Sequence, residues 1–209
     1  KNNNVQSFDR AFFAHIGLVF NSFCKSLAYY LTRAQINCQK GHFQRYKQKL
    51  TWVSSEFTLL TNVALAILGP SLKKRENISA RFGDILSNCY LITATLREFE
   101  NNPNQKDEDL VDYICNYCFN EIQIAREEII INIGYLGFLL PLVKINPFSI
   151  KEKDSLNAKI VKNLENEDYL KQMTSSLFIS NSKEDRLAKI QKAVKLNKEA
   201  QNSFKILKE

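Results

Sequence analysis

Apolar residues recur at helical spacing through the first two thirds of the chain, and they predict long amphipathic helices. After a helix-breaking pair at Gly69 and Pro70, apolar residues repeat at alternating steps of four and three. The members of this stripe are Ile78, Phe82, Ile85, Cys89, Ile92, Leu96 and Phe99. An equally regular stripe runs ahead of the break, over residues 42–68. We expect the helices over residues 42–68 and 71–100 to pair and to bury each other's apolar faces.

The first predicted helix, over residues 7–33, is apolar on nearly every face. Such a helix lies in a large core, lies against a partner or enters a membrane. The polar residues that interrupt its centre are Asn21, Ser22, Lys25 and Ser26. Because these residues make a bilayer span costly, we expect a central core helix with one face left for a partner.

A fourth helical stripe covers residues 107–134, and the chain is therefore predicted to be all-α. The expected architecture is a helical bundle of four long helices over residues 1–145, followed by shorter C-terminal helices over 146–209 that pack on it. Within this extension we expect a helix over residues 154–164, a partly ordered connection over 169–179 and a last helix to about Leu207. A capping box formed by Ser182 and Asp185 would begin the last helix.

The strongly apolar residues 129–145 are broken by Gly134, Gly137 and Pro141, and they allow two interpretations. They form either a buried helix end and turn, or a hydrophobic patch that docks on another domain.

Charge is distributed unevenly along the chain. Residues 1–100 hold 13 Lys and Arg against 6 Asp and Glu, and they account for the whole net charge of +7. A basic half can attract nucleic acid, an anionic membrane or an acidic partner, but an ordinary solvated surface is the favoured interpretation. Since the chain carries no nucleic-acid-binding motif, we expect no nucleic-acid partner.

The cysteines and the lack of an initial methionine bear on the cellular compartment and the origin of the chain. Five cysteines, an odd number without a secretory signal, are typical of reduced core residues in a cytoplasmic protein. The only methionine is Met173, so we expect that the chain belongs to a longer polypeptide.

No self-contained active site is predicted. Cys115 and Cys118 have the spacing of half a zinc site, but no second Cys or His pair follows, so both are predicted to be core residues. His15 and His42 are isolated, and neither a nucleophile elbow nor a Gly-rich phosphate loop is present. The acids at 107–109 suit a helix start, and those at 127–128 are expected on a solvent face. We therefore assign no catalytic, cofactor-binding or metal-ligating residue.

One charged cluster is the best remaining candidate for a contact with a ligand or a domain. Its members are Lys73, Lys74, Arg75, Arg81 and Asp84. The cluster could clamp a phosphate, a CoA pyrophosphate or a carboxylate, because Arg forks suit such groups. We favour the alternative, which is a domain contact or a local ion-pair network. In that network Arg81 meets Asp84 one turn away, and Glu76 meets other helices.

Two long segments carry a family resemblance. They read RAFFAHIGLVFNSFCKSL at residues 10–27 and LAILGPSLKKRENISARFGDILSNCYLITATL at residues 65–96, with a weaker echo, DSLNAKIVKNL, at 154–164. The chain resembles the C-terminal region of long bacterial acyl-CoA dehydrogenases of the FadE type, which act in fatty-acid β-oxidation.

The resemblance implies a helical domain of an FAD enzyme that oxidises acyl-CoA to trans-2-enoyl-CoA. The family's flavin site and its glutamate base lie in a preceding core, and no position here matches that glutamate. The implied partners are the dehydrogenase domains of the same polypeptide and, in a homodimer, a second copy. The rival hypothesis is a stand-alone helical adaptor that binds a protein partner or an anionic membrane surface, in the cytoplasm or at the inner membrane.

Overall fold

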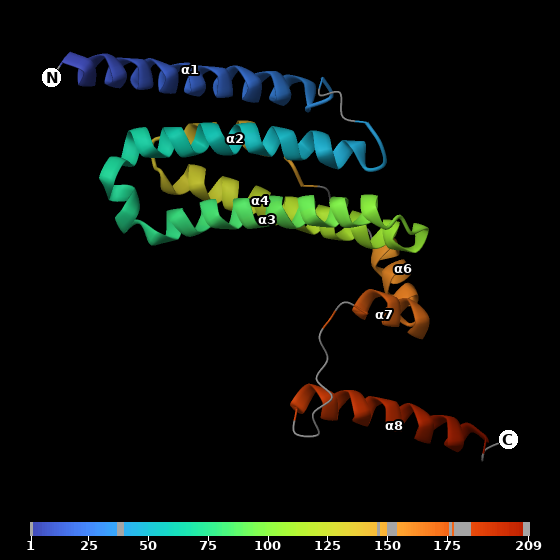
Figure 1. Ribbon diagram of the computed structural model, residues 1–209. Coiled ribbons are helices and arrows are strands. Elements are labelled where there is room, and N and C mark those ends of the chain that lie inside the picture. The colour runs from blue at the N-terminus through green and yellow to red at the C-terminus, as the bar shows by residue number, and fades with distance from the viewer. Residues whose placement is uncertain are drawn as a thin grey trace. The chain divides into compact units, whose positions relative to one another are not determined.

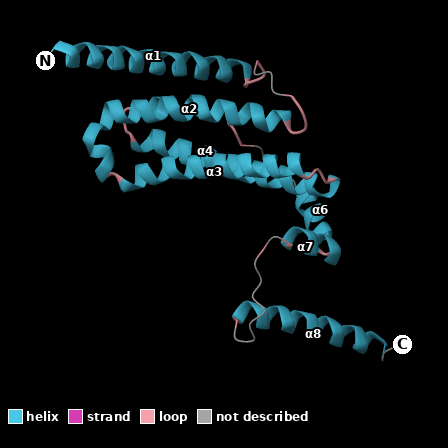
Figure 2. Cartoon of the chain, in the orientation of Figure 1, coloured by secondary structure: helices cyan, strands magenta, loops and turns pink. Residues whose placement is uncertain are grey.

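Helices account for all the regular secondary structure in the part of the chain that the structure describes. The computed structural model describes residues 2–36, 40–145, 147–149, 154–175, 177 and 185–206 (Figures 1 and 2). The predicted all-α class is confirmed. The chain divides into two compact units, Lys1–Ile160 and Val161–Glu209.

Four long helices form the first unit, close to the predicted positions. They are α1 (Asn2–Thr32), α2 (Gln44–Leu68), α3 (Glu76–Asn101) and α4 (Glu108–Asn132). The shorter elements are η1 (Gly69–Lys74), η2 (Gln105–Asp107), η3 (Gly137–Leu139), α5 (Leu140–Ile145) and α6 (Asp154–Leu164), the last of which begins in this unit. The predicted third helix starts later than expected because the turn after the break is a 3-10 helix.

Local chemistry explains where the long helices end. α2 stops at Gly69, whose φ of +51° suits a residue without a Cβ, and Pro70 follows inside η1. α4 is preceded by Asp107 and holds Glu108 and Asp109 in its first turn, so the predicted acidic helix start is confirmed. Shortly after α4, Gly134 adopts a φ of +80° and turns the chain.

The helices pair differently from the simplest prediction. α3 packs along α4, and α1 packs on α2 (Figure 1). The predicted pairing of α2 with α3 exists on a smaller scale, for example where the Phe57 and Phe82 rings lie 5.8 Å apart. The main neighbour of α3 is therefore α4, which is next along the chain.

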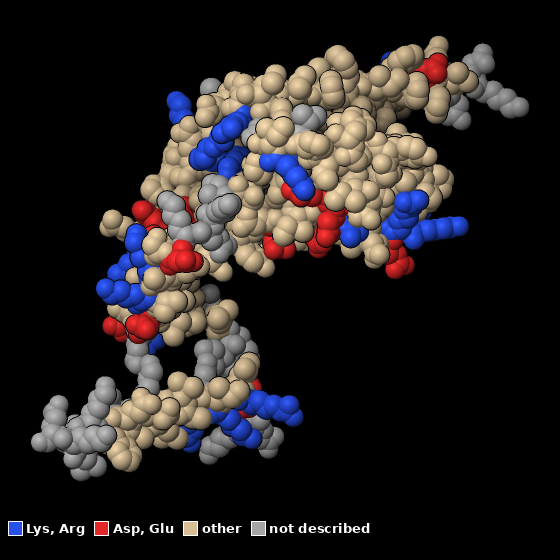
Figure 3. Space-filling model, turned by 180° about the vertical axis from the view of Figure 1, so that it is seen from behind, with Lys and Arg blue, Asp and Glu red and all other residues tan. Residues whose placement is uncertain are grey.

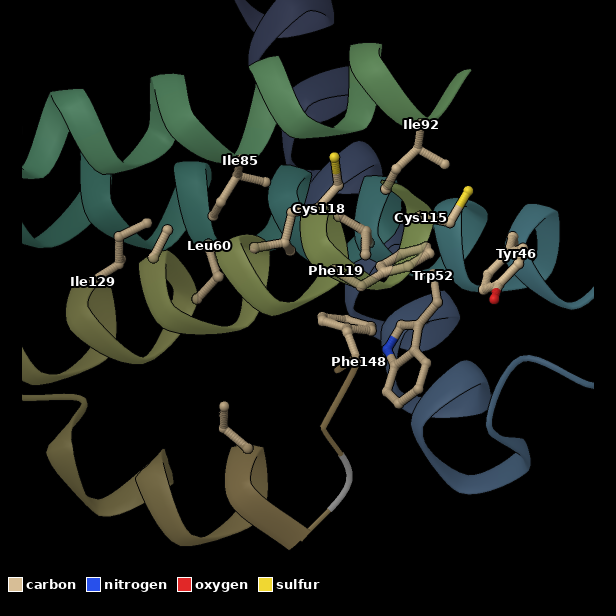
Figure 4. Close-up of a cluster of buried hydrophobic side chains, with 14 of the residues drawn as sticks. Tyr46, Trp52, Leu60, Ile85, Ile92, Cys115, Cys118, Phe119, Ile129 and Phe148 are labelled. Carbon is tan, nitrogen blue, oxygen red and sulfur yellow. The ribbon is translucent and has the colours of Figure 1, made fainter. Parts of the chain in front are cut away.

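The core lies between α2, α3 and α4 (Figure 4). Its largest fully buried side chains are Phe119, Phe148, Ile92, Ile122, Ile129, Ile130, Val53, Cys115 and Cys118. Burying one such apolar side chain contributes about 1.5–3 kcal/mol. Phe148 belongs to this core although it follows the four long helices along the chain.

The prediction that the first helix is a core helix is wrong. Between Val5 and Thr32, where side chains of α1 are described, the residues that are buried are Ser22 and Ser26. Its phenylalanines and leucines are largely exposed. The physical reason is that α1 packs on one side of α2, while α3 and α4 pack against each other and contact α2 from the other side (Figure 1). An exposed apolar face is present on α1, and it is larger than expected, whereas a partner for it stays a prediction.

The interpretation of residues 129–145 as a buried helix end and turn is confirmed for part of the segment, and docking of the rest on another domain stays a prediction. Ile129, Ile130, Ile133, Leu136 and Val143 are buried against the core, as in a buried helix end and turn. A second set of apolar side chains in the segment is exposed, and it consists of Ile131, Tyr135, Phe138 and Ile145.

The second unit contains α7 (Glu167–Thr174) and α8 (Arg186–Ile206). α7 occupies much of the stretch that was predicted as a connection, and Asn166 caps it by accepting hydrogen bonds from the Asp168 and Tyr169 amides. At the start of α8, Asp185 accepts one from the Leu187 amide, while Ser182 lies outside the described residues. Phe148 and Lys159 contact the four-helix bundle, whereas the packing of residues 146–209 on it as one extension stays a prediction.

Candidate functional site

The predicted basic cluster surrounds the junction of η1 and α3. Lys73 and Lys74 end η1, and Arg75 precedes the first turn of α3. A surface hollow of about 480 Å³ at this junction is lined by Lys74, Arg75, Glu76, Asn77, Ile78, Arg81 and Asn132. Three of the five predicted residues therefore share one hollow, whereas Lys73 and Asp84 lie outside its lining. The hollow is open and polar, so it could contact an anion or a neighbouring domain.

Arg81 is held by another helix, which corrects the predicted local pairing. Its Nε donates to Glu128 Oε2 of α4 at 2.5 Å instead of pairing with Asp84 one turn along α3. Sequence spacing favoured the pair within the helix, but the close packing of α3 on α4 brings Glu128 to Arg81. The acids at 127–128 are half-buried rather than on a free solvent face, and both have partners: Glu128 pairs with Arg81, and Glu127 accepts a hydrogen bond from Gln123.

Cys115 and Cys118 are buried in the core, as predicted. Burial raises the pKa of the Cys115 thiol to about 12, and it raises the pKa of Cys118 as well, so both thiols are protonated and unreactive at neutral pH. Cys24 is exposed on α1 and is not one of the core cysteines, and Cys38 lies outside the described residues. Within the described ranges, no three His, Cys, Asp or Glu side chains converge as metal ligands would.

His42 is less isolated than its sequence position indicated. Its Nε2 lies 3.4 Å from Glu108 Oε1, and its ring stacks on Phe99 at 5.3 Å between centroids. These contacts join the loop before α2 to the facing ends of α3 and α4. His15 is exposed on α1.

A buried polar cluster in the core was not predicted from the sequence. It joins Lys49 and Glu56 of α2 to Gln123 and Arg126 of α4 around the Phe148 segment. Arg126 Nε donates to Glu56 Oε1 at 2.6 Å, and Arg126 Nη1 donates to Gln123 Oε1 at 3.0 Å. The sequence signal for this cluster is a set of polar residues on the apolar sides of two helices. That signal is weak without the tertiary structure.

Burial shifts the pKa values in this cluster in opposite directions. It lowers the pKa of Lys49 to about 8, with a smaller contribution from the Arg45 charge. It raises the pKa of Glu56, and the neighbouring Arg126 opposes that rise. Beside Glu56 and Arg126 the core contains a cavity of about 10 Å³, which is far too small for a flavin or an acyl-CoA.

These observations define a helical bundle domain with a packed core, and comparison with known proteins identifies the family. The model of the family described as "Acyl-CoA dehydrogenase, C-terminal, bacterial type" matches residues 1–209. The chain belongs to this family of acyl-CoA dehydrogenase C-terminal domains. No solved structure matches the chain significantly.

Proposed function

We propose that the chain is a docking domain of an FAD-dependent acyl-CoA dehydrogenase and that it covers part of the dehydrogenase domains of the same polypeptide. The parent enzyme would oxidise acyl-CoA to trans-2-enoyl-CoA in fatty-acid β-oxidation. Its flavin and its catalytic glutamate would be supplied by those other domains. The family assignment supports the parent enzyme, and the exposed surface of α1 carries the docking role.

On α1 small polar residues are buried and large apolar residues are exposed, which is the reverse of a helix whose partners are all present. Ser22 and Ser26 are 9 % and 8 % exposed, whereas ten large apolar side chains of α1 are 47–72 % exposed. These ten are Val5, Phe8, Phe12, Phe13, Ile16, Leu18, Phe20, Phe23, Leu27 and Leu31. In water, helices bury their apolar stripe and expose their small polar residues, so the exposed surface of α1 supports the proposal that a partner covers it.

The spacing of the exposed residues indicates what kind of partner fits. Phe13, Ile16, Phe20, Phe23 and Leu27 follow one another at steps of three and four, which is the seam spacing of packed helices. From residue 13 to residue 27 this seam runs roughly 21 Å at 1.5 Å per residue. A partner that presents a helix of similar length would fill it.

The size of the surface exceeds what a free domain normally exposes. Ten half-exposed side chains leave roughly 1,000 Å² of apolar surface, since an aromatic side chain alone can bury 150–250 Å². A typical monomer exposes no patch above about 600 Å², and a stable interface buries about 800 Å² per partner. Figure 3 shows the band of α1 at the top of the view almost without charged residues, while charges of both signs cover the helices below.

The proposal is tested in the full-length enzyme by making part of α1 polar. The variant Phe13→Ser/Phe20→Ser/Leu27→Ser should loosen the domain, which would show as faster proteolytic separation of the domain and a changed mass in light scattering. The matched control is Leu86→Ser/Tyr90→Ser/Leu91→Ser on α3, because those residues are also at least half-exposed. If the α1 variant behaves like this control and like the wild type, the docking role is wrong.

A membrane surface is the second candidate occupant of α1. Segments Val5–Thr32 and Gln44–Lys74 are long and apolar enough to cross a membrane by length and composition, although a core helix can pass the same test. The proposed location is cytoplasmic, and in this alternative it is peripheral to the inner membrane. Salt-dependent flotation of the enzyme with phosphatidylglycerol-containing vesicles, lost in the α1 variant, would favour the membrane over the dehydrogenase domains.

A further inference from the structure

Phe148 is anchored in the bundle by its backbone as well as by its ring. Within residues 147–149 it is the residue whose side chain is buried. Its ring meets the Trp52 ring edge-on at 4.5 Å, and Arg126 Cζ lies 4.3 Å above its centroid. Its N–H donates to Gln123 Oε1 at 3.1 Å, and its carbonyl accepts from Lys49 Nζ at 2.9 Å. Side chains from α2 and α4 therefore satisfy both backbone groups of one buried residue.

The same side chains depend on Phe148 for their own partners. Lys49, Gln123 and Arg126 are 6 %, 5 % and 3 % exposed, so their polar atoms are largely out of reach of water. Without Phe148, Lys49 would lose its carbonyl acceptor, and Gln123 would lose one of its donors. A partly satisfied buried network is worse than an apolar core of the same shape, so the network holds together only when Phe148 is in place.

Neighbouring residues of the segment fit this arrangement poorly. Pro147 has no N–H to donate to Gln123. Ile145 and Ile150 are apolar and could fill a simple hydrophobic slot, but neither has an aromatic face for Arg126 or an edge contact for Trp52. The ring and backbone contacts together therefore distinguish Phe148 from Pro147, Ile145 and Ile150.

We propose that Lys49, Glu56, Gln123 and Arg126 form a clasp that selects Phe148 and thereby fixes the register in which the chain crosses α2 and α4 after α5. Buried ionic groups often contribute little net stability, and a register role is the best-attested reason for retaining them. Further along the chain, the middle of α6 lies near the start of α4, where Lys159 Nζ is 3.8 Å from Asp109 Oδ1. The proposal concerns the fold of the domain and does not depend on the docking role of α1.

Trp52 reports directly on the clasp because it is the only tryptophan in the chain and is 2 % exposed. The test is Phe148→Leu, which keeps apolar volume but removes the ring contacts. Amide exchange at position 148 should rise about tenfold, since a cation–ring contact and an aromatic pair are together lost. Acrylamide quenching of Trp52 should increase at the same time.

The matched control is Phe138→Leu, because Phe138 is 73 % exposed in the same stretch of chain. It should leave exchange at position 148 and Trp52 quenching unchanged. If Phe148→Leu gives the same result as this control, the slot accepts any apolar residue, and the proposal is overturned. Far-UV circular dichroism and urea unfolding identify any variant that has lost its fold.

A second variant separates register from global stability. Lys49→Met keeps the apolar stem of the lysine but leaves the Phe148 carbonyl without its donor. The clasp predicts about tenfold faster amide exchange at residues 148–149 with little change in the global unfolding midpoint. The exposed Lys73→Met is the control. A uniform change in exchange across the whole bundle, or none at residues 148–149, would contradict a register role.

Discussion

α1 and α4 are both long apolar helices, yet the tertiary structure uses them in opposite ways. α4 buries eleven residues, among them the polar Asn116, Gln123 and Arg126. The described part of α1 buries two serines and exposes ten large apolar side chains. α4 is covered by α2, α3 and the Phe148 segment, whereas α1 packs on α2. The burial of an apolar stripe is thus decided by how many neighbours surround the helix.

The largest expected effect contrasts a core phenylalanine with one on α1. Phe119→Ala should lower the free energy of unfolding of the chain by about 3–5 kcal/mol, because it leaves a cavity beside Tyr46 and Lys49. Phe20→Ala on α1 should change it by less than about 0.5 kcal/mol. Urea unfolding of both variants measures the difference. Equal losses would mean that a partner covers α1 in solution even in the isolated chain.

The next effect concerns the buried ion pair of the core. Arg126→Met should lower the free energy of unfolding by about 3 kcal/mol, because Glu56 is left without its buried partner. The double variant Arg126→Met/Glu56→Gln should recover part of that loss, since the carboxylate is removed too. A double variant that loses the sum of both single effects would show that the two side chains do not interact.

A smaller effect is expected from the titration of Lys49. Burial lowers its pKa to about 8 in the folded state, against about 10.5 when the chain unfolds. The unfolded state therefore binds more protons between these values, so the Lys49 contribution to stability rises as pH increases from 8 to 10.5. The stability of the wild type relative to Lys49→Met should rise by about 2 kcal/mol over that range.

Comparison with Lys49→Met is needed because the buried cysteines act in the opposite direction. The pKa values of Cys89 and Cys115 are raised to about 12 in the folded state. Their contribution to the stability of the folded protein therefore falls as the pH rises above the pKa of a free thiol. This contribution is present in both proteins and cancels in the difference. If the stability difference between the wild type and Lys49→Met stays constant or falls as the pH rises, Lys49 is solvated.

The smallest effect concerns the half-exposed pair at the edge of the basic hollow. Arg81→Gln should lower the free energy of unfolding by about 0.2–1 kcal/mol, because solvent screens the contact with Glu128. Glu128→Gln should cost a similar amount, and thermal unfolding at low and high salt would measure both. A loss above about 2 kcal/mol would place Arg81 among the buried charges of the core.

The sequence was sufficient to predict the helices and much of the core. Regular spacing of Ile78, Ile85, Ile92 and Phe99 predicted the buried side of α3, and the structure confirms it. Gly69 with Pro70 marked the end of α2, and Cys115 with Cys118 were correctly predicted as core residues. These features follow from local backbone preferences and from the helical repeat, which are properties of neighbouring residues.

Sequence spacing could not predict contacts between residues that are far apart in the chain. Arg81 has an acid one turn away in its own helix, yet it pairs with Glu128 because α3 packs on α4. Lys49, Gln123 and Phe148 are far apart in the chain and meet only through the fold. Sequence periodicity shows which side of a helix is apolar, but it does not show which other element will cover that side.

The sequence alone therefore determined the all-α class, the approximate positions of the four long helices and the family resemblance, because these depend on local spacing and on long matched segments. The tertiary structure alone decided that α1 lies outside the core and that Phe148 lies inside it. Burial is a property of the whole arrangement, since a side chain is removed from water only where other elements happen to surround it.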